Sequence, residues 1–163
     1  MKNRYTVSFT ITFVVLALDQ ISKYFVRQLL PLNHSVEVVR DFLNLVHVQN
    51  PGIIFGILSR STYKLTTYLL ITVSLVAITF LLLFLRSLKD RDLVLFIAIS
   101  LILGGAIGNL VDRIAFEKVI DFIDFHWRTY HWPAFNLADS AITIGMVILV
   151  IQVLSDETNT PSM

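Results

Sequence analysis

The sequence predicts an all-α integral membrane protein with four transmembrane helices, a small extracytoplasmic β platform and an outer interfacial loop. Composition and four long apolar stretches lead to this prediction. Of the 163 residues, 55% are hydrophobic and only 15% are charged, and the mean hydropathy is +0.72. A chain this apolar cannot cover itself with a polar surface. A helix needs about twenty mostly apolar residues to cross the hydrocarbon layer, and the stretches that approach this length are 6–26, 63–85, 93–111 and 136–154.

Charge and residue usage exclude several classes of function. The formal net charge is +1, and neither end carries a basic tail, so we expect no nucleic-acid partner. The chain has no cysteine, which excludes disulfides, thiol nucleophiles and cysteine metal sites. Its four histidines form no HExxH pair, so we expect no metal.

The first apolar stretch resembles a signal peptide, because Lys2 and Arg4 precede it. However, the stretch contains Asp19 and Lys23 and shows no small-x-small cleavage site. We therefore interpret it as a retained transmembrane helix.

Basic residues predict the orientation in the membrane. Lys2 and Arg4 precede the first span, and Arg86, Lys89 and Arg91 lie in the short link between the second and third spans. The positive-inside rule places both regions in the cytoplasm. Four crossings then return the carboxyl terminus to the same side, so both termini are expected to be cytoplasmic.

The two long connections, residues 27–64 and 111–136, are then expected at the outer face. The first contains β-branched runs at 36–39 and 45–48, bounded by turn residues, which predicts a small β platform. The second is rich in aromatic residues, which is typical of a segment at the lipid headgroups. These aromatic residues are Phe125, Trp127, Tyr130 and Trp132.

Polar residues of three spans are predicted to meet at one depth. With this topology the last turns of spans one and three and the start of span four all lie near the outer surface. Charged and amide side chains at membrane depth are costly and therefore candidates for function. The residues are Asp19, Gln20 and Lys23, then Asn109, Asp112 and Arg113, then Asn136 and Asp139.

Spacing supports a shared site, because residues three or four apart lie on one face of a helix. This holds for Asn136 with Asp139 and for Asn109 with Arg113. The glycines at 104, 105 and 108 allow close helix packing. Without cysteine or a metal motif, a pair of carboxylates that shares one proton is the remaining economical device for hydrolysing an amide.

Five motifs, in order and over nearly the whole chain, resemble those of the prolipoprotein signal peptidases (signal peptidase II), an aspartic peptidase family. They are LDQISK at 18–23, QNPG at 49–52 with Phe55-Gly56, GGAIGNLVDR at 104–113, VIDF at 119–122 and FNLADS at 135–140. One departure is that Ile53 and Ile54 stand where family members often have two alanines, which bears on the width of the pocket.

The resemblance implies a single membrane-embedded peptidase domain, residues 1–163, that removes the signal peptide from diacylglyceryl-modified bacterial prolipoproteins just before the lipidated cysteine. It implies no cofactor and a place in the bacterial cytoplasmic (inner) membrane, with the site near the outer, periplasmic face. We expect a monomer in contact with membrane lipids and the prolipoprotein. The implied catalytic pair is Asp121 and Asp139, and the implied supporting residues are Asp19, Lys23, Asn50, Gly52, Asn109, Arg113 and Asn136.

Each of these residues also has a structural interpretation. Asp139 heads a helix that it could cap, and Asp19 with Lys23 could form only an ion pair at a helix end. Asp124 competes with Asp121 for a catalytic role, and the family motif selects Asp121. Asp112 remains undecided, and a role for Asn50 before a Pro-Gly turn depends mainly on the resemblance. The histidines His47, His126 and His131 are expected at the platform or interface and not as metal ligands.

Two other classes of function remain open at this point. A proton or ion relay would use the intramembrane acids but predicts polar residues through the whole depth of the membrane. A scaffold that binds another membrane protein through its glycine-rich helix face would tolerate Asp139→Asn.

Overall fold

Four long helices and one small antiparallel sheet make up the protein. The computed structural model describes residues 2–52, 60–88 and 92–158. The helices are α1 (Lys2–Leu29), α2 (Arg60–Ser87), α3 (Leu93–Phe116) and α4 (Leu137–Thr158). The strands are β1 (Ser35–Val39), β2 (Leu43–Asn50), β3 (Val119–Trp127) and β4 (Tyr130–His131). All four helices are long and apolar enough to cross a membrane, as the sequence predicts.

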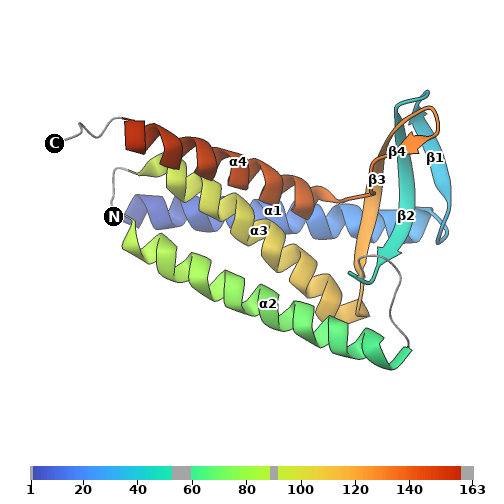
Figure 1. Ribbon diagram of the computed structural model, residues 1–163, viewed down its shortest axis with the longest axis horizontal. Helices are drawn as coiled ribbons and strands as arrows, with labels where there is room; N and C mark the ends of the chain where they lie inside the picture. Colours follow the sequence, from blue (N-terminus) through green and yellow to red (C-terminus); the bar gives the residue numbers. More distant parts are fainter. Residues whose placement is uncertain (1, 53–59, 89–91, 159–163) are drawn as a thin grey trace.

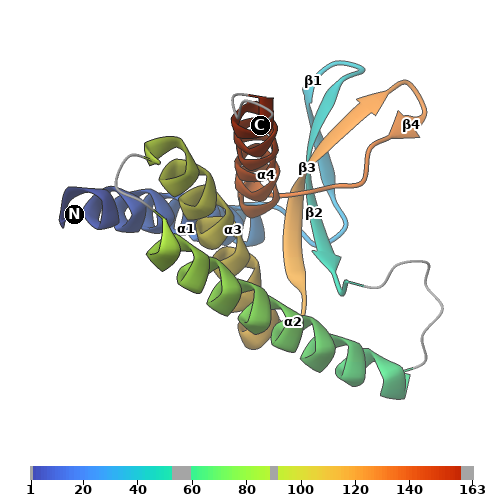
Figure 2. The same cartoon turned by 60° about the vertical axis from the view of Figure 1, so that its left-hand side comes forward.

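The helices run along the long axis of the molecule and the sheet stands across one end of them (Figure 1). The start of α1 and the end of α4 lie at the opposite end. Helix α3 is the central helix, because it packs against α1, α2 and α4. In its most apolar window 61% of the residues are buried, against 6% in α2. Helix α2 packs mainly on α3 and diverges from the bundle toward the sheet end (Figure 2).

Close packing of α3 depends on glycine. A Cβ atom added to Gly105 would collide with the backbone carbonyl of Ala138 on α4. One added to Gly108 would lie 2.5 Å from the carboxylate of Asp19 on α1. In lipid, where water drives no hydrophobic association between helices, small residues let the backbones approach closely enough to pack. The glycine-rich stretch of α3 therefore sets the distance between the polar ends of three helices.

The strands follow one another in the order β1-β2-β3-β4, and each pair is antiparallel. In the pairing of β2 with β3, Asn50 lies opposite Val119 and Leu43 opposite Phe125. A small apolar core of Val26 from α1 with Ile120 and Phe122 from β3 fixes the sheet to the end of the bundle. The position of β3 is thus determined by backbone pairing on one side and by α1 on the other.

The structure confirms the predicted β platform, since β1 and β2 contain the runs at 36–39 and 45–48. The label all-α was too narrow, however, and the expected loop at 111–136 was wrong in two places. Helix α3 continues to Phe116 and ends with Glu117 in the left-handed region at φ +59°. Residues 119–127 then form the longest strand, because pairing with β2 satisfies the backbone groups of a segment that is buried at the helix ends.

We predict that Gly105→Ala destabilises the bundle by about 1–3 kcal/mol, because the new methyl group must push α4 away from α3. The measurement is the thermal unfolding midpoint of the purified protein in detergent. Ile114→Ala is the control, since Ile114 lies on the same helix with 64% of its surface exposed, and it should cost less than about 0.5 kcal/mol. Equal midpoints for Gly105→Ala and the parent would show that α3 and α4 do not need this close contact.

Candidate active site

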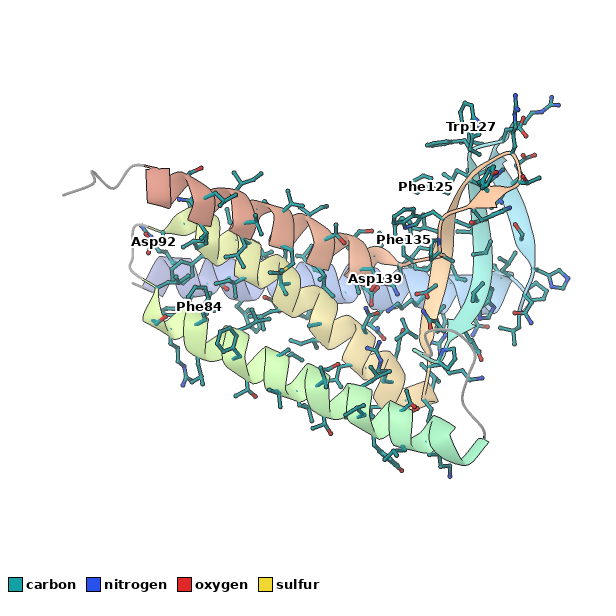
Figure 3. All side chains as sticks on the ribbon, in the orientation of Figure 1. Phe84, Asp92, Phe125, Trp127, Phe135 and Asp139 are labelled. Carbon is teal, nitrogen blue, oxygen red and sulfur yellow. The ribbon has the colours of Figure 1, made fainter. Side chains whose placement is uncertain are left out.

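Asp121 and Asp139 lie at the sheet end of the bundle, one on a strand and the other on a helix. Asp121 is on β3 and is 2% exposed, whereas Asp139 is in the first turn of α4. Figure 3 shows Asp139 where α4 meets the sheet, at the opposite end from Asp92. Both carboxyl groups are held by amide donors alone, because neither has an ion-pair partner among the residues that the structure describes.

Each of the four carboxyl oxygens accepts one N–H group. Asp121 Oδ1 accepts from the side chain of Asn136 at 2.8 Å, and Oδ2 accepts from the side chain of Asn50 at 2.9 Å. Asp139 Oδ1 accepts from the side chain of Asn109 at 2.7 Å, and Oδ2 accepts from the backbone N–H of Asn136 at 3.2 Å. Asn136 therefore joins the two acids.

Asn136 can join them because it caps α4. Its side-chain oxygen accepts the backbone N–H of Asp139 at 2.9 Å while its own backbone N–H donates to the Asp139 carboxylate. This is the reciprocal arrangement of a capping box, with an aspartate three residues after the cap. The capping interpretation of Asp139 is thus correct, and the same bonds fix the direction of its carboxyl group.

Asn50 is positioned by a turn at the end of β2. Its side-chain oxygen accepts the backbone N–H of Gly52 at 2.8 Å, which leaves its amide free to donate to Asp121. Gly52 has a φ of +73°, a conformation that favours glycine, and an added Cβ would collide with Leu70 on α2. Ile53 and Ile54 lie outside the described residues.

Lys23 is the centre of a buried network behind the two acids. Its ammonium group contacts Asp19 Oδ2 and Asp112 Oδ2, each at 2.8 Å, and Asn109 Oδ1 at 3.0 Å. An ammonium has three hydrogens to donate, and all three have acceptors here. At 1% exposure, Lys23 is stable only because these partners replace its lost hydration. Asp19 also accepts the backbone N–H of Ala138 at 2.9 Å, which connects the network to α4.

Asn109 connects this network to the proposed catalytic acids, because it contacts both Lys23 and Asp139. Its side-chain oxygen faces Lys23 and its amide faces Asp139, so one residue on α3 contacts both groups. Arg113, one turn later, donates to the backbone carbonyl of Asn109 at 3.3 Å and lines a cavity of about 150 Å³ between α2 and α3. Its positive charge interacts with Asp139 and Asp121, although the described residues show no ion pair between them.

Comparison with known proteins shows the family of this chain. The family model described as signal peptidase (SPase) II matches residues 11–155. The chain belongs to the signal peptidase II family. A lipoprotein signal peptidase of Syntrophotalea carbinolica is 45% identical over 141 residues, 86% of each chain. That of Geobacter metallireducens is 38% identical over 160 residues, 96% of each chain. A solved bacterial membrane enzyme at 33% identity superposes with a TM-score of 0.82 over 97% of this chain and 93% of that one.

As a member of the signal peptidase II family, the chain is a peptidase and a multi-pass bacterial membrane protein. This favours a hydrolase over an ion relay or a scaffold. Within residues 2–52, 60–88 and 92–158, no three His, Asp or Glu side chains are grouped so that they could hold a metal ion.

Asp121 has an unusual pKa among the carboxyl groups outside the membrane-spanning helices. Burial raises the pKa of Asp121 to about 6, and the negative charge of Asp139 acts in the same direction. The hydrogen bonds from Asn50 and Asn136 act in the opposite direction, because they stabilise the ionised form. Asp121 therefore keeps a proton up to a higher pH than an ordinary aspartate.

Sequence analysis did not predict the roles of Gln20 and Asp112. The amide nitrogen of Gln20 lies 3.1–3.2 Å from oxygens of Asp19, Gly108 and Asp112. Asp112 accepts from Lys23 and from the backbone N–H of Ile120 at 3.2 Å, which holds the start of β3. The available signal was their cost at membrane depth, which identified both as polar residues near the site but not as bridges between helices.

Asp124 and the histidines lie elsewhere. Asp124 contacts His131 and Asn44, each at 2.9 Å, so its partners belong to the sheet. His47 contacts the backbone oxygen of Leu30 at 2.8 Å and is a platform residue. His126 stacks on His131 with ring centroids 5.1 Å apart.

We predict that Lys23→Met destabilises the protein by about 3–5 kcal/mol, because it leaves two buried carboxylates without their counter-charge. The measurement is again the unfolding midpoint in detergent. The double variant Lys23→Met/Asp112→Asn should recover part of the loss, since one unpaired charge is removed. An unfolding midpoint of Lys23→Met at or above that of the parent would disprove the central role of the ammonium.

Proposed function

We propose that this chain removes the signal peptide from diacylglyceryl-modified prolipoproteins, cutting just before the lipidated cysteine, with Asp121 and Asp139 as the catalytic pair. The observation that carries this proposal is the pair of carboxyl groups joined through Asn136 and held by amides alone. Prolipoprotein as the substrate follows from the relatives, several of which are named lipoprotein signal peptidases.

The proposed chemistry uses one shared proton. Asp139 as carboxylate takes a proton from a water whose oxygen attacks the carbonyl carbon before the cysteine, and Asp121 gives its proton to the carbonyl oxygen. The tetrahedral intermediate then collapses and the carbon–nitrogen bond breaks. The cysteine nitrogen takes the proton held by Asp139, and Asp121 takes back a proton from a hydroxyl group of the intermediate as the carbonyl re-forms. The raised pKa of Asp121 supports its assignment as the acid. Lys23 and Arg113 limit the excess of negative charge around the four carboxyl groups of the site.

The proposed setting is the bacterial inner membrane, with both termini in the cytoplasm and the catalytic pair at the periplasmic face. The basic residues near the ends of α1 and α2 support this orientation. The start of α1 and the end of α4 lie at the end of the bundle opposite the sheet. We propose a single membrane-embedded domain over residues 1–163 that acts as a monomer and without a cofactor.

We predict that Asp121→Asn and Asp139→Asn each lower the cleavage rate by at least about 1,000-fold, because an amide can neither give nor take the shared proton. The measurement is gel-shift cleavage of a diacylglyceryl-modified prolipoprotein by the purified chain in detergent. Asp124→Asn is the matched control on the same strand and should keep at least about a tenth of the parent activity. Full activity in Asp121→Asn or Asp139→Asn would refute the aspartyl mechanism.

The raised pKa of Asp121 predicts a descending alkaline limb. Below about pH 6 Asp121 holds its proton, and as pH rises through about 6 it ionises, so kcat/KM should fall. Asn50→Ala removes a bond to the ionised form, and the limb should therefore move to higher pH. The check is a profile of kcat/KM against pH for parent and variant. A limb that stays in place in Asn50→Ala would assign the titration to another group.

A further inference from the structure

An open cavity of about 550 Å³ adjoins Asp139, and the proposed chemistry of the two acids does not use it. Its walls are the segment 132–135, which leads into α4, and the first two turns of α4, from Asp139 to Ile144. Ligand sites in proteins commonly have volumes of roughly 300–1,000 Å³. The cavity thus places a binding volume of ordinary size directly against one of the proposed catalytic carboxyl groups.

Few polar groups in the lining of this cavity are available to bind a ligand. The hydroxyls of Ser140 and Thr143 donate to the backbone oxygens of Asn136 and Asp139, at 2.9 and 2.8 Å. These hydroxyl groups are therefore already used within α4. The indole N–H of Trp132 is a donor for which the described part of the chain provides no acceptor. The cavity suits a ligand that is mostly hydrocarbon with an oxygen acceptor near one end.

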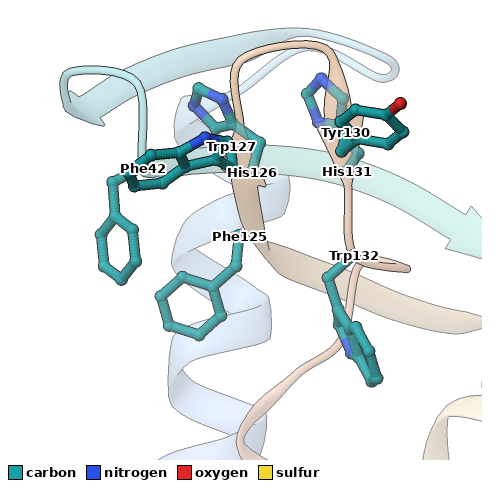
Figure 4. A pocket seen from close by; sticks show the side chains of 7 residues that line it. All are labelled: Phe42, Phe125, His126, Trp127, Tyr130, His131 and Trp132. Carbon is teal, nitrogen blue, oxygen red and sulfur yellow. The ribbon is translucent and has the colours of Figure 1, made fainter.

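Trp132 also fixes the depth of the cavity in the membrane. It lines a second, aromatic cavity of about 340 Å³ on the sheet together with Phe125 (Figure 4). Trp127, Tyr130 and Trp132 are 69%, 80% and 68% exposed. Exposed tryptophan and tyrosine rings favour the level of lipid headgroups and esters. The cavity beside Asp139 therefore begins at the depth where a membrane lipid carries its glycerol esters.

The length of the cavity distinguishes between the two parts of a lipidated substrate. From Asp139 to Ile144 the helix rises only about 8 Å, at 1.5 Å per residue. A signal helix that crosses the bilayer needs about twenty residues and would extend far beyond this volume. The glycerol ester and the first carbons of two acyl chains are of the appropriate size, and the rest of each chain can remain in lipid.

We propose that this cavity receives the diacylglyceryl group of the substrate, with the indole of Trp132 donating to an ester oxygen and Ile144 contacting the acyl chains. This inference rests on the proposed function, because the group is part of the proposed substrate. It makes Trp132 and Ile144 specificity-determining residues for the lipid, whereas Asp121 and Asp139 act on the peptide bond. Binding of the lipid here places the bond before the cysteine next to Asp139.

The test uses two substrates of one peptide sequence, with dipalmitoylglyceryl or diacetylglyceryl cysteine. The ratio of their kcat/KM values measures how strongly the enzyme uses the long acyl chains. Ile144→Trp fills the cavity and should lower this ratio at least fivefold. Met146→Trp is the matched control, because Met146 is also exposed, at 46%, but points about 160° away from Ile144 around α4 and does not line the cavity. The control ratio should stay within twofold of the parent.

Two outcomes with Ile144→Trp overturn the inference. An equal loss on both substrates would mean damage to Asp139 and no lipid site, and an unchanged ratio would mean that the acyl chains bind elsewhere. A parent enzyme that cleaves neither substrate would instead overturn the proposed function.

A second measurement needs no variant. The lipidated product peptide, with a photoreactive diazirine on the first carbons of an acyl chain, is bound to the parent and illuminated. Labelling should fall on peptides that contain residues 132–144, and excess unlabelled product should abolish it. Labelling confined to α1 or α2 would overturn the inference, as would labelling of 132–144 by a probe in the signal helix and not by the acyl probe.

Discussion

A single buried ammonium group holds the structure together at its functional end. Lys23 on α1 has to satisfy three hydrogens away from water, and its acceptors come from α1 and α3. The cost of burying a charge is offset only when every partner is present. The relative positions of α1 and α3 are therefore fixed by the requirement of this charge, and the bond from Ala138 to Asp19 extends the constraint to the start of α4.

This constraint requires close helix packing. The network spans two helix interfaces, and its side chains are short, so the helices must approach closely. Gly105 and Gly108 make that approach possible, because each faces an atom of a neighbouring helix where a Cβ would not fit. The close packing of the helices in lipid and the pairing of the buried charges thus both depend on these two glycines. The orientation of Asp121 and Asp139 depends on this packing as well, because their donors are themselves held in place. Asn109 is oriented by the lysine network, and Asn136 is oriented by the helix cap.

Much of the arrangement at this end of the molecule could be predicted from patterns in the sequence. Span length and basic flanks placed Asp19, Asn109 and Asn136 at one depth, and the structure joins them through hydrogen bonds. The partners of Gln20 and Asp112 could not be predicted, because they depend on how each helix is rotated about its axis. Strand β3 was missed for a related reason. Its partner β2 lies some 70 residues earlier in the chain, and its aromatic and acidic residues are also typical of an interfacial loop.

The position of Asp139 in the chain has a consequence for biogenesis. It lies in α4, which is synthesised after the other three described helices, whereas the network that orients it begins in α1. A nascent chain that has inserted only three helices has Asp121 but lacks its proposed partner and the cap that joins them. Insertion of α4 is therefore the step at which the proposed catalytic pair comes together.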